Sequence, residues 1–208
     1  LGWREFVRHV YEEHRAEYGR ANALGAGLPL PSWYWGEPSG LRCLDLTVKT
    51  VLDTGHSHHI TRLMVLSNLA TLLGVDPQAL NRWFWVAYVD AYEWVVTPNV
   101  VGMGTWGDGG VFATKPYVSS GKYIHRMGPS LCRGCTFDPK RTEGEAACPF
   151  NHLYWEFLHR HRERFARNVR MAVPMATLRK LSPATMADHR RWAEVWRERA
   201  RSAGASTA

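Results

Sequence analysis

Apolar residues near the start of the chain recur with the spacing of a helix. Trp3, Phe6, Val7, Val10, Tyr11 and His14 fall at i, i+3, i+4, i+7, i+8 and i+11, which places them on one face. The pattern predicts an amphipathic helix. It is already under way at Leu1, which indicates a sequence that forms part of a longer protein.

Two longer helices are expected next. The first covers residues 44–73, interrupted near Gly55, and Gly74 suits the position just past a helix end. Asp76 and Pro77 then supply an N-cap and a first-turn proline for a helix over 77–95. Pro98 is expected to end that helix.

The remaining chain predicts loops and shorter helices. Residues 19–40 form a proline-broken loop around Trp33-Tyr34-Trp35, and residues 98–121 hold six glycines and two prolines without a helical period. A loop of that length indicates a functional role. Helices are expected at 123–127, at 151–171 and from Pro183 to just before Ser202. Since no strand-like alternation occurs, we predict an all-α fold: one helical domain over 1–201, with a flexible tail at 202–208.

Composition and charge narrow the class of protein. The 208 residues are 45% hydrophobic, which is enough for a sizeable core, and the net charge is +7. An excess of positive charge favours an anionic partner such as nucleic acid, although a solvated basic surface gives the same composition. The ten tryptophans exceed what aliphatic packing alone requires.

The sequence also predicts a compartment. It contains neither an apolar run of membrane-spanning length nor a signal peptide, so we expect a cytoplasmic monomer with no membrane contact. A reducing compartment argues against disulfides for the four cysteines.

The cysteine spacing is that of a metal site. Cys132 and Cys135 form a C-x2-C pair, Cys148 follows after twelve residues, and Cys43 lies far upstream. Zinc fits this count. The Cys148-Pro149 step favours an iron–sulfur cluster, because proline after the last ligand recurs in such clusters. Four free buried thiols are a third interpretation.

Two sequence segments are distinctive enough to carry a resemblance. They run Gly55-His56-Ser57-His58-His59-Ile60-Thr61-Arg62 and Lys115-Pro116-Tyr117-Val118-Ser119-Ser120-Gly121-Lys122-Tyr123-Ile124. With the opening Gly2-Trp3-Arg4-Glu5-Phe6 and the four cysteines, they resemble the iron–sulfur bacterial cryptochromes and photolyases, also called prokaryotic (6-4) photolyases.

The resemblance implies a fold and cofactors. It corresponds to the later part of the family's all-α FAD-binding domain, without the N-terminal antenna domain and the first FAD-domain helices. It implies a [4Fe-4S] cluster on Cys43, Cys132, Cys135 and Cys148, as well as FAD. An antenna chromophore is implied only where the N-terminal domain is present.

The resemblance also assigns roles to residues. His59 contacts the lesion and manages a proton with His58 beside it, a task that suits histidine because its pKa lies near neutrality. A helix cap or a stray metal ligand is the alternative for these histidines. Arg62 and Asp90 correspond to a buried ion pair beside the flavin, and Val96 stands where many photolyases have a polar residue facing flavin N5. Trp83 and Trp35 correspond to electron-relay tryptophans, while Tyr117 and Tyr123 correspond to residues near the lesion pocket and the flavin.

The expected function is light-driven repair of UV-damaged DNA, most specifically of (6-4) pyrimidine photoproducts. Two alternatives remain: a cryptochrome-like photoreceptor without repair, and a truncated, flavin-free metal-binding module. The basic residues from His159 to Arg170 offer a path for a phosphate backbone, or simply a solvated helix face.

Overall fold

The fold is all-helical, as predicted. The computed structural model describes residues 1–205, and within them the regular elements are α-helices and short 3-10 or π-helices, the latter two labelled η. In chain order they are α1 (Gly2–Tyr18), η1 (Ser32–Trp35), α2 (Arg42–Thr54), α3 (His59–Thr61), η2 (Arg62–Ser67), α4 (Asn68–Leu73), α5 (Pro77–Ala87), α6 (Glu93–Thr97), η3 (Pro98–Gly104), α7 (Gly121–Met127), α8 (Pro129–Cys132), α9 (Pro149–Arg160), α10 (Arg162–Phe165), η4 (Val169–Met171), α11 (Ala172–Leu178) and α12 (Pro183–Ala205). Across the described residues, no helix is long and apolar enough to cross a membrane.

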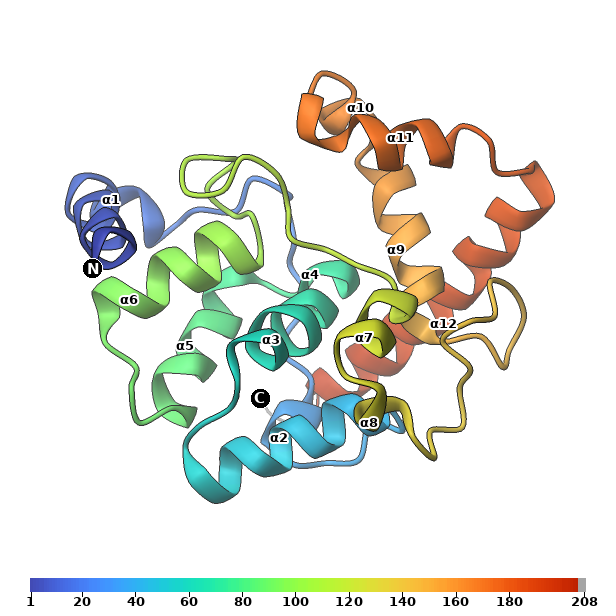
Figure 1. Cartoon of the computed structure of the whole chain (residues 1–208), viewed down its shortest axis with the longest axis horizontal. Helices are drawn as coiled ribbons and strands as arrows, with labels where there is room; N and C mark the ends of the chain where they lie inside the picture. Colours follow the sequence, from blue (N-terminus) through green and yellow to red (C-terminus); the bar gives the residue numbers. More distant parts are fainter. Residues whose placement is uncertain (206–208) are drawn as a thin grey trace.

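The helices gather around α4, in which every residue is buried. On one side α1 packs against α6 and η3 (Figure 1). On the other side α9 packs along α12, and both contact α4. The short helices α7 and α8 lie between α2 and α9. The buried residues therefore form one large cluster around α4 and two smaller clusters under α1.

Helix α1 covers the predicted range but buries only part of its predicted face. Val7 and Tyr11 are buried, whereas the side chains of Trp3 and Phe6 are 57% and 42% exposed. The two exposed rings lie against Phe112 from the loop after η3.

The helix predicted over 44–73 is interrupted where expected. Gly55 ends α2 with φ of +65°, a conformation that favours glycine. A Cβ at this position would also collide with the side chain of Val89. The chain becomes helical again at His59 and stays so to Leu73, and Gly74 then ends α4 with φ of +89°. Asp76 caps α5 by accepting a hydrogen bond from Gln78 N at 3.1 Å.

Two boundaries differ from the prediction for 77–95. Helix α5 ends at Ala87, and a turn through residues 88–92 precedes α6. Pro98 does not end the helix: the chain continues to Gly104 as the π-helix η3. Proline has no N–H for the helical hydrogen bond, and its ring crowds the preceding turn. A wider π-type turn accommodates both effects.

The loop predicted from 98 therefore begins only after Gly104. Trp106 fastens it: its indole N–H donates to Ala113 O at 2.9 Å, and its ring packs edge-on against Phe165. Asp108 accepts hydrogen bonds from Gly110 N and Phe112 N, at 3.0 and 2.9 Å. Side-chain and backbone contacts thus fix this glycine-rich segment.

Two expectations for the C-terminal part are wrong. The helix predicted over 151–171 is three pieces, α9, α10 and η4, so the basic residues from His159 to Arg170 do not share one helix face. The flexible tail was expected from Ser202, but α12 continues through Ala205. Gly204 lies so close to Pro29 that a Cβ would collide with the proline ring. Residues 206–208 lie outside the described part of the chain.

Candidate functional site

A cleft opens between the two π-helical segments. Its lining residues come from α3, η2, α5, α6, η3 and the turn after α5: His59, Arg62, Leu63, Ser67, Phe84, Asp90, Val95, Val96, Asn99, Val100 and Met103. Gly104 lets η3 approach η2, because a Cβ there would lie 2.9 Å from Ser67. Since π-type turns redirect side chains and concentrate at functional sites, this cleft is the leading candidate.

Arg62 is held in the cleft by three kinds of contact. Its Nε donates to Ser57 O at 2.9 Å, and its two terminal nitrogens donate to the two Asp90 carboxylate oxygens at 3.0 Å each. The guanidinium also stacks over the ring of Tyr88, 4.1 Å from the centroid. A bidentate pair backed by an aromatic ring fixes both the position and the plane of the guanidinium.

The Arg62–Asp90 pair is less buried than the resemblance implied. The Arg62 side chain is 24% exposed and that of Asp90 is 50% exposed. The pair therefore lies at the mouth of the cleft, where solvent weakens the attraction between the two charges.

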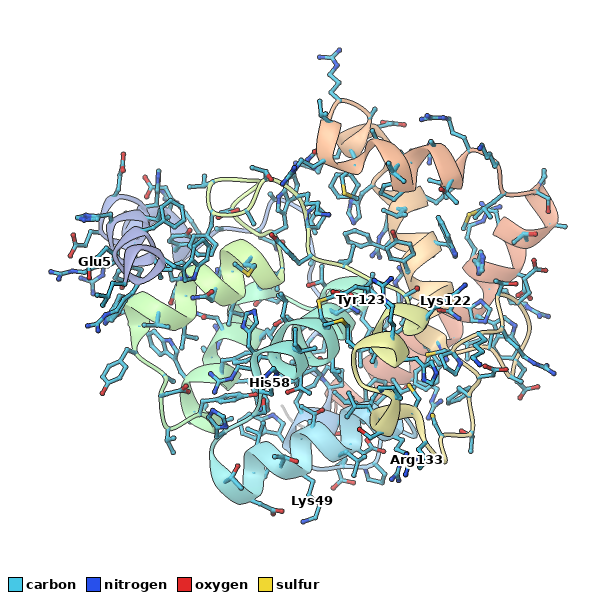
Figure 2. The ribbon with its side chains drawn as sticks, in the orientation of Figure 1. Glu5, Lys49, His58, Lys122, Tyr123 and Arg133 are labelled. Carbon is cyan, nitrogen blue, oxygen red and sulfur yellow. The ribbon has the colours of Figure 1, made fainter. Side chains whose placement is uncertain are left out.

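The two candidate histidines, His58 and His59, make different contacts. His58 is the N-cap of α3, because its Nδ1 accepts a hydrogen bond from Ile60 N at 3.2 Å. His59 is exposed and lines the cleft with Arg62, as their i, i+3 spacing predicted. His56 is exposed and does not line the cleft. Figure 2 shows the position of His58 on the segment that leads into α3.

Behind the cleft lies a stack of aromatic rings. Phe84, which lines the cleft, is parallel to Tyr88 with centroids 5.1 Å apart, and both meet Trp83 edge-on. Burial raises the pKa of Tyr88 to about 12, and its hydroxyl lies 2.7 Å from Ser57 Oγ. Trp83 is 1% exposed, and its indole N–H donates to Tyr34 O at 2.8 Å.

The second candidate relay residue lies at the surface. Trp35 is 49% exposed, and within the described residues its ring is not in contact with that of Trp83. Tyr34, the preceding residue, contacts Trp83 edge-on at 5.3 Å instead. The aromatic contacts therefore lead from the cleft through Trp83 to Tyr34.

The candidate tyrosines lie outside the cleft. Tyr117 is 39% exposed. Tyr123 lines a different surface hollow, where Arg126 stacks over its ring at 5.0 Å. Val96, by contrast, is buried in the cleft wall. Of the seven residues assigned to catalysis and flavin binding, the structure brings His59, Arg62, Asp90 and Val96 together.

The four cysteines converge near α8. Burial raises the pKa of Cys43, and the charges of Cys148, Cys132 and Cys135 raise it further, so the four sulfurs lie within electrostatic range of one another. Burial also raises the pKa of Cys148 to about 12. Cys148 caps α9 and packs against Gly121, where a Cβ would collide with its sulfur.

The segment that carries these cysteines is closed by its own backbone. Asp138 N donates to Ala146 O and Cys148 N donates to Asp138 O, at 2.8 and 3.0 Å. The side chain of Asn151 links α7 to the same segment: it accepts from Gly121 N and donates to Pro139 O and Arg141 O. In the described part of the chain, no three His, Cys, Asp or Glu side chains are arranged to hold a metal ion.

Sequence reasoning missed part of the cleft. Asn99, Val100 and Met103 lie in η3, which was interpreted as loop because of Pro98. A signal was present, since Val95, Val96, Asn99, Val100 and Met103 follow i, i+1, i+4, i+5 and i+8 spacing. The proline concealed it.

Comparison with known proteins gives one extensive match. The chain is 43% identical over 182 residues to a (6-4) photolyase from Agrobacterium fabrum, a match that covers 88% of this chain. The chain belongs to the photolyase family. It spans 36% of the length of that relative, so it corresponds to about a third of a photolyase.

A second relative has no assigned function. An uncharacterised protein of Acanthamoeba polyphaga mimivirus is 28% identical over 102 residues, which is 49% of this chain and 75% of the viral protein. No family model matches the chain. Within the photolyase family, the cleft and the converging cysteines are therefore the features that bear on function.

Proposed function

We propose that this chain is the helical, FAD-binding part of a light-driven enzyme that repairs (6-4) pyrimidine photoproducts in DNA. The observation that carries the proposal is the cleft between η2 and η3, where His59 and the fixed Arg62–Asp90 pair face an apolar wall. This arrangement combines a histidine that can donate a proton, a fixed cation and apolar side chains. The sequence similarity of the chain to a (6-4) photolyase supports the choice of lesion.

The cleft suits the isoalloxazine ring of FAD. Leu63, Phe84 and Val100 offer apolar surface for a planar ring, while Arg62 and Asn99 supply polar groups at its edge. When bound, reduced FAD supplies the photoexcited electron that starts repair. A fixed guanidinium beside it favours negative charge in the cleft.

In this proposal the residues of the chain handle protons and orientation. His59 donates a proton to the lesion as the hydroxyl returns between the two bases. His58 holds the first turn of α3, because its Nδ1 is already committed to Ile60 N. Arg62 fixes the second turn through Ser57 O and Asp90.

For the four converging cysteines we propose a [4Fe-4S] cluster, with a single zinc ion as the alternative. A cluster takes one thiolate on each of its four irons, whereas a structural zinc ion takes four thiolates on one metal. The Cys148-Pro149 step supports the cluster, because proline after the last ligand recurs in such sites.

The decisive test replaces His59 in the complete protein. His59→Ala should lower repair of an oligonucleotide carrying a (6-4) lesion by about 10²–10⁴-fold, because a positioned acid is lost. The control is His56→Ala, a nearby exposed histidine that does not line the cleft. Repair is measured as restored dinucleotide by chromatography after illumination of the reduced protein.

Each outcome selects a function. Equal repair by His59→Ala and the wild type would remove His59 from the mechanism. No repair by a wild-type protein that holds reduced FAD would favour a cryptochrome-like photoreceptor. A purified complete protein without flavin absorption would favour a flavin-free metal-binding module.

A further inference from the structure

Positive charge is concentrated in residues 115–141, which include Cys132 and Cys135. Between residues 115 and 141 the only acidic residue is Asp138, against the six basic residues Lys115, Lys122, Arg126, Arg133, Lys140 and Arg141. Ion pairs found in the described structure include none of these six. Five of them are exposed, and Lys115 is half-buried.

Three of these cations share one surface hollow. Lys122, Arg126 and Lys140 line it together with the hydroxyl-bearing residues Ser120 and Tyr123, and acidic residues do not contribute to its lining. Figure 2 labels Lys122 and Tyr123 where they project from α7. Uncompensated cations beside hydroxyl donors are the groups that contact phosphate oxygens.

The hollow is held in shape by the surrounding backbone. Asn151 bonds Gly121 at the start of α7, and it also bonds the carbonyls of Pro139 and Arg141, the two residues on either side of Lys140. Arg126 is ordered by stacking over Tyr123. Three cations are therefore presented from two segments that the fold keeps together, which reduces the entropy lost on binding.

We propose that this hollow, with Lys122, Arg126 and Lys140 at its centre, binds the phosphate backbone of duplex DNA beside the lesion. The proposal rests on the proposed function and adds the surface that grips the duplex. The hollow lies within reach of the cleft, because Asn68 donates to Ser119 O at 3.0 Å just before α7. Ser67, the residue before Asn68, lines the cleft, and Ser120, the residue after Ser119, lines the hollow.

The cleft and the hollow are therefore joined through neighbouring residues, so a duplex whose damaged bases enter the cleft would bring flanking phosphates to the hollow. The hollow would then hold the undamaged part of the duplex while the cleft receives the damaged bases.

The test measures binding of the complete protein to a short, labelled, undamaged duplex in the dark. The variant Lys122→Gln/Arg126→Gln/Lys140→Gln is compared with Arg164→Gln/Arg167→Gln/Arg170→Gln. The second variant removes the same charge from exposed residues on and after α10, a part of the chain away from α7 (Figure 1). Fluorescence anisotropy over a salt series gives the affinity and its salt dependence.

We expect DNA affinity to fall only when the charges of the hollow are removed. The first variant should bind at least about tenfold more weakly, and the slope of log K against log salt should fall by about two to three, near 0.9 per phosphate contact. The control should keep the wild-type slope. Circular dichroism, together with the visible absorption of the proposed cluster, checks that both variants are folded.

Three results would overturn the proposal. Equal losses in both variants would mean that net charge, and not this hollow, drives binding. A first variant with wild-type affinity would remove the hollow from the DNA surface. Binding to anionic vesicles in place of duplex, with the same residue dependence, would assign the hollow to lipid headgroups. Because the assay needs neither light nor a lesion, its failure is distinct from a failure of repair.

Discussion

Two neighbouring regions of the molecule are rich in basic residues but use them differently. In the pair α9 and α12, two arginines pair with one buried carboxylate: Arg197 bonds Glu156 inside the core, and Arg160 lies 3.9 Å from Glu156 while it donates to Leu72 O at 3.1 Å. In the segment 115–141 the cations face solvent without an acidic partner among the described residues. The same residue types thus hold helices together in one region and remain available for an anion in the other.

The difference shows that pairing matters more than composition. The run from His159 to Arg170 is the denser basic stretch in the sequence, yet two of its five arginines are engaged: Arg160 is partly buried beside Glu156, and Arg162 pairs with Glu163. Burial lowers the pKa of Arg160 to about 10, in spite of the neighbouring Glu156. The Arg160 guanidinium is thus engaged by Leu72 O and Glu156 within the fold.

The largest expected effect tests what folds the cysteine segment. Cys135→Ser should abolish the proposed cluster and unfold the loop around it, because metal binding at such sites supplies folding free energy, of order 10 kcal/mol for zinc-finger peptides. Iron content, visible absorption and proteolysis of the loop measure this. The control is Thr136→Ala, the exposed neighbour.

A different metal would change this interpretation. Stoichiometric zinc without iron in protein purified anaerobically would contradict the cluster. A Cys135→Ser protein that keeps wild-type resistance to proteolysis would show that the segment folds without metal.

The second effect tests the ion pair between α9 and α12. Glu156→Gln should lower the free energy of unfolding by about 3 kcal/mol, because it removes the buried carboxylate beside Arg197 and leaves only the exposed Glu194 to pair with that charge. The matched control Glu198→Gln, on the exposed side of α12, should change it by less than about 0.5 kcal/mol. Urea denaturation followed by circular dichroism measures both. A small loss for Glu156→Gln would mean that the pair is dispensable.

The third effect is a pH dependence of stability, which arises where His152 of α9 contacts His189 of α12 and the backbone of Gly144. His152 Nε2 lies 3.1 Å from Gly144 O and must donate to it, so its Nδ1 accepts from His189 Nδ1 at 3.1 Å. Burial lowers the pKa of His152 as well as that of His189, which favours this neutral arrangement. Burial, with a smaller contribution from His152, lowers the pKa of His189 to about 4; Asp188 and Glu143 oppose the shift.

The sign of the pH effect follows from these pKa values. Between pH 6.5 and 4 the unfolded chain takes up a proton at His189 that the folded chain resists. Stability present at pH 7 is thus lost as the pH falls through this window, by roughly 2–3 kcal/mol. Urea midpoints of the wild type and of His189→Leu measure it. The variant should have a flatter pH profile, whereas His9→Ala, an exposed control, should match the wild type. Parallel profiles for all three proteins would contradict the assignment.

Much of the fold could be predicted because its signals are local. Gly55 and Gly74 adopt positive φ where the pattern ended helices, and the Asp76 cap forms as its sequence predicts. These features depend on a few neighbouring residues, whose conformational preferences act without the rest of the chain. The all-α class and the shared face of His59 and Arg62 follow from the same periodicity.

By itself, then, the sequence determined the all-α class, the first helix, the helix ends at Gly55 and Gly74, the cap at Asp76 and the cysteine spacing. Only the tertiary structure decided that the helix passes through Pro98 into a π-type turn, because packing of Gly104 against Ser67 and the bond from Thr71 to Gly104 O hold that segment. It also decided which charges are paired, how exposed Asp90 is, and that Tyr34, not Trp35, contacts Trp83. Each of these depends on residues far apart in the chain, and local preference carries no information about which of them meet.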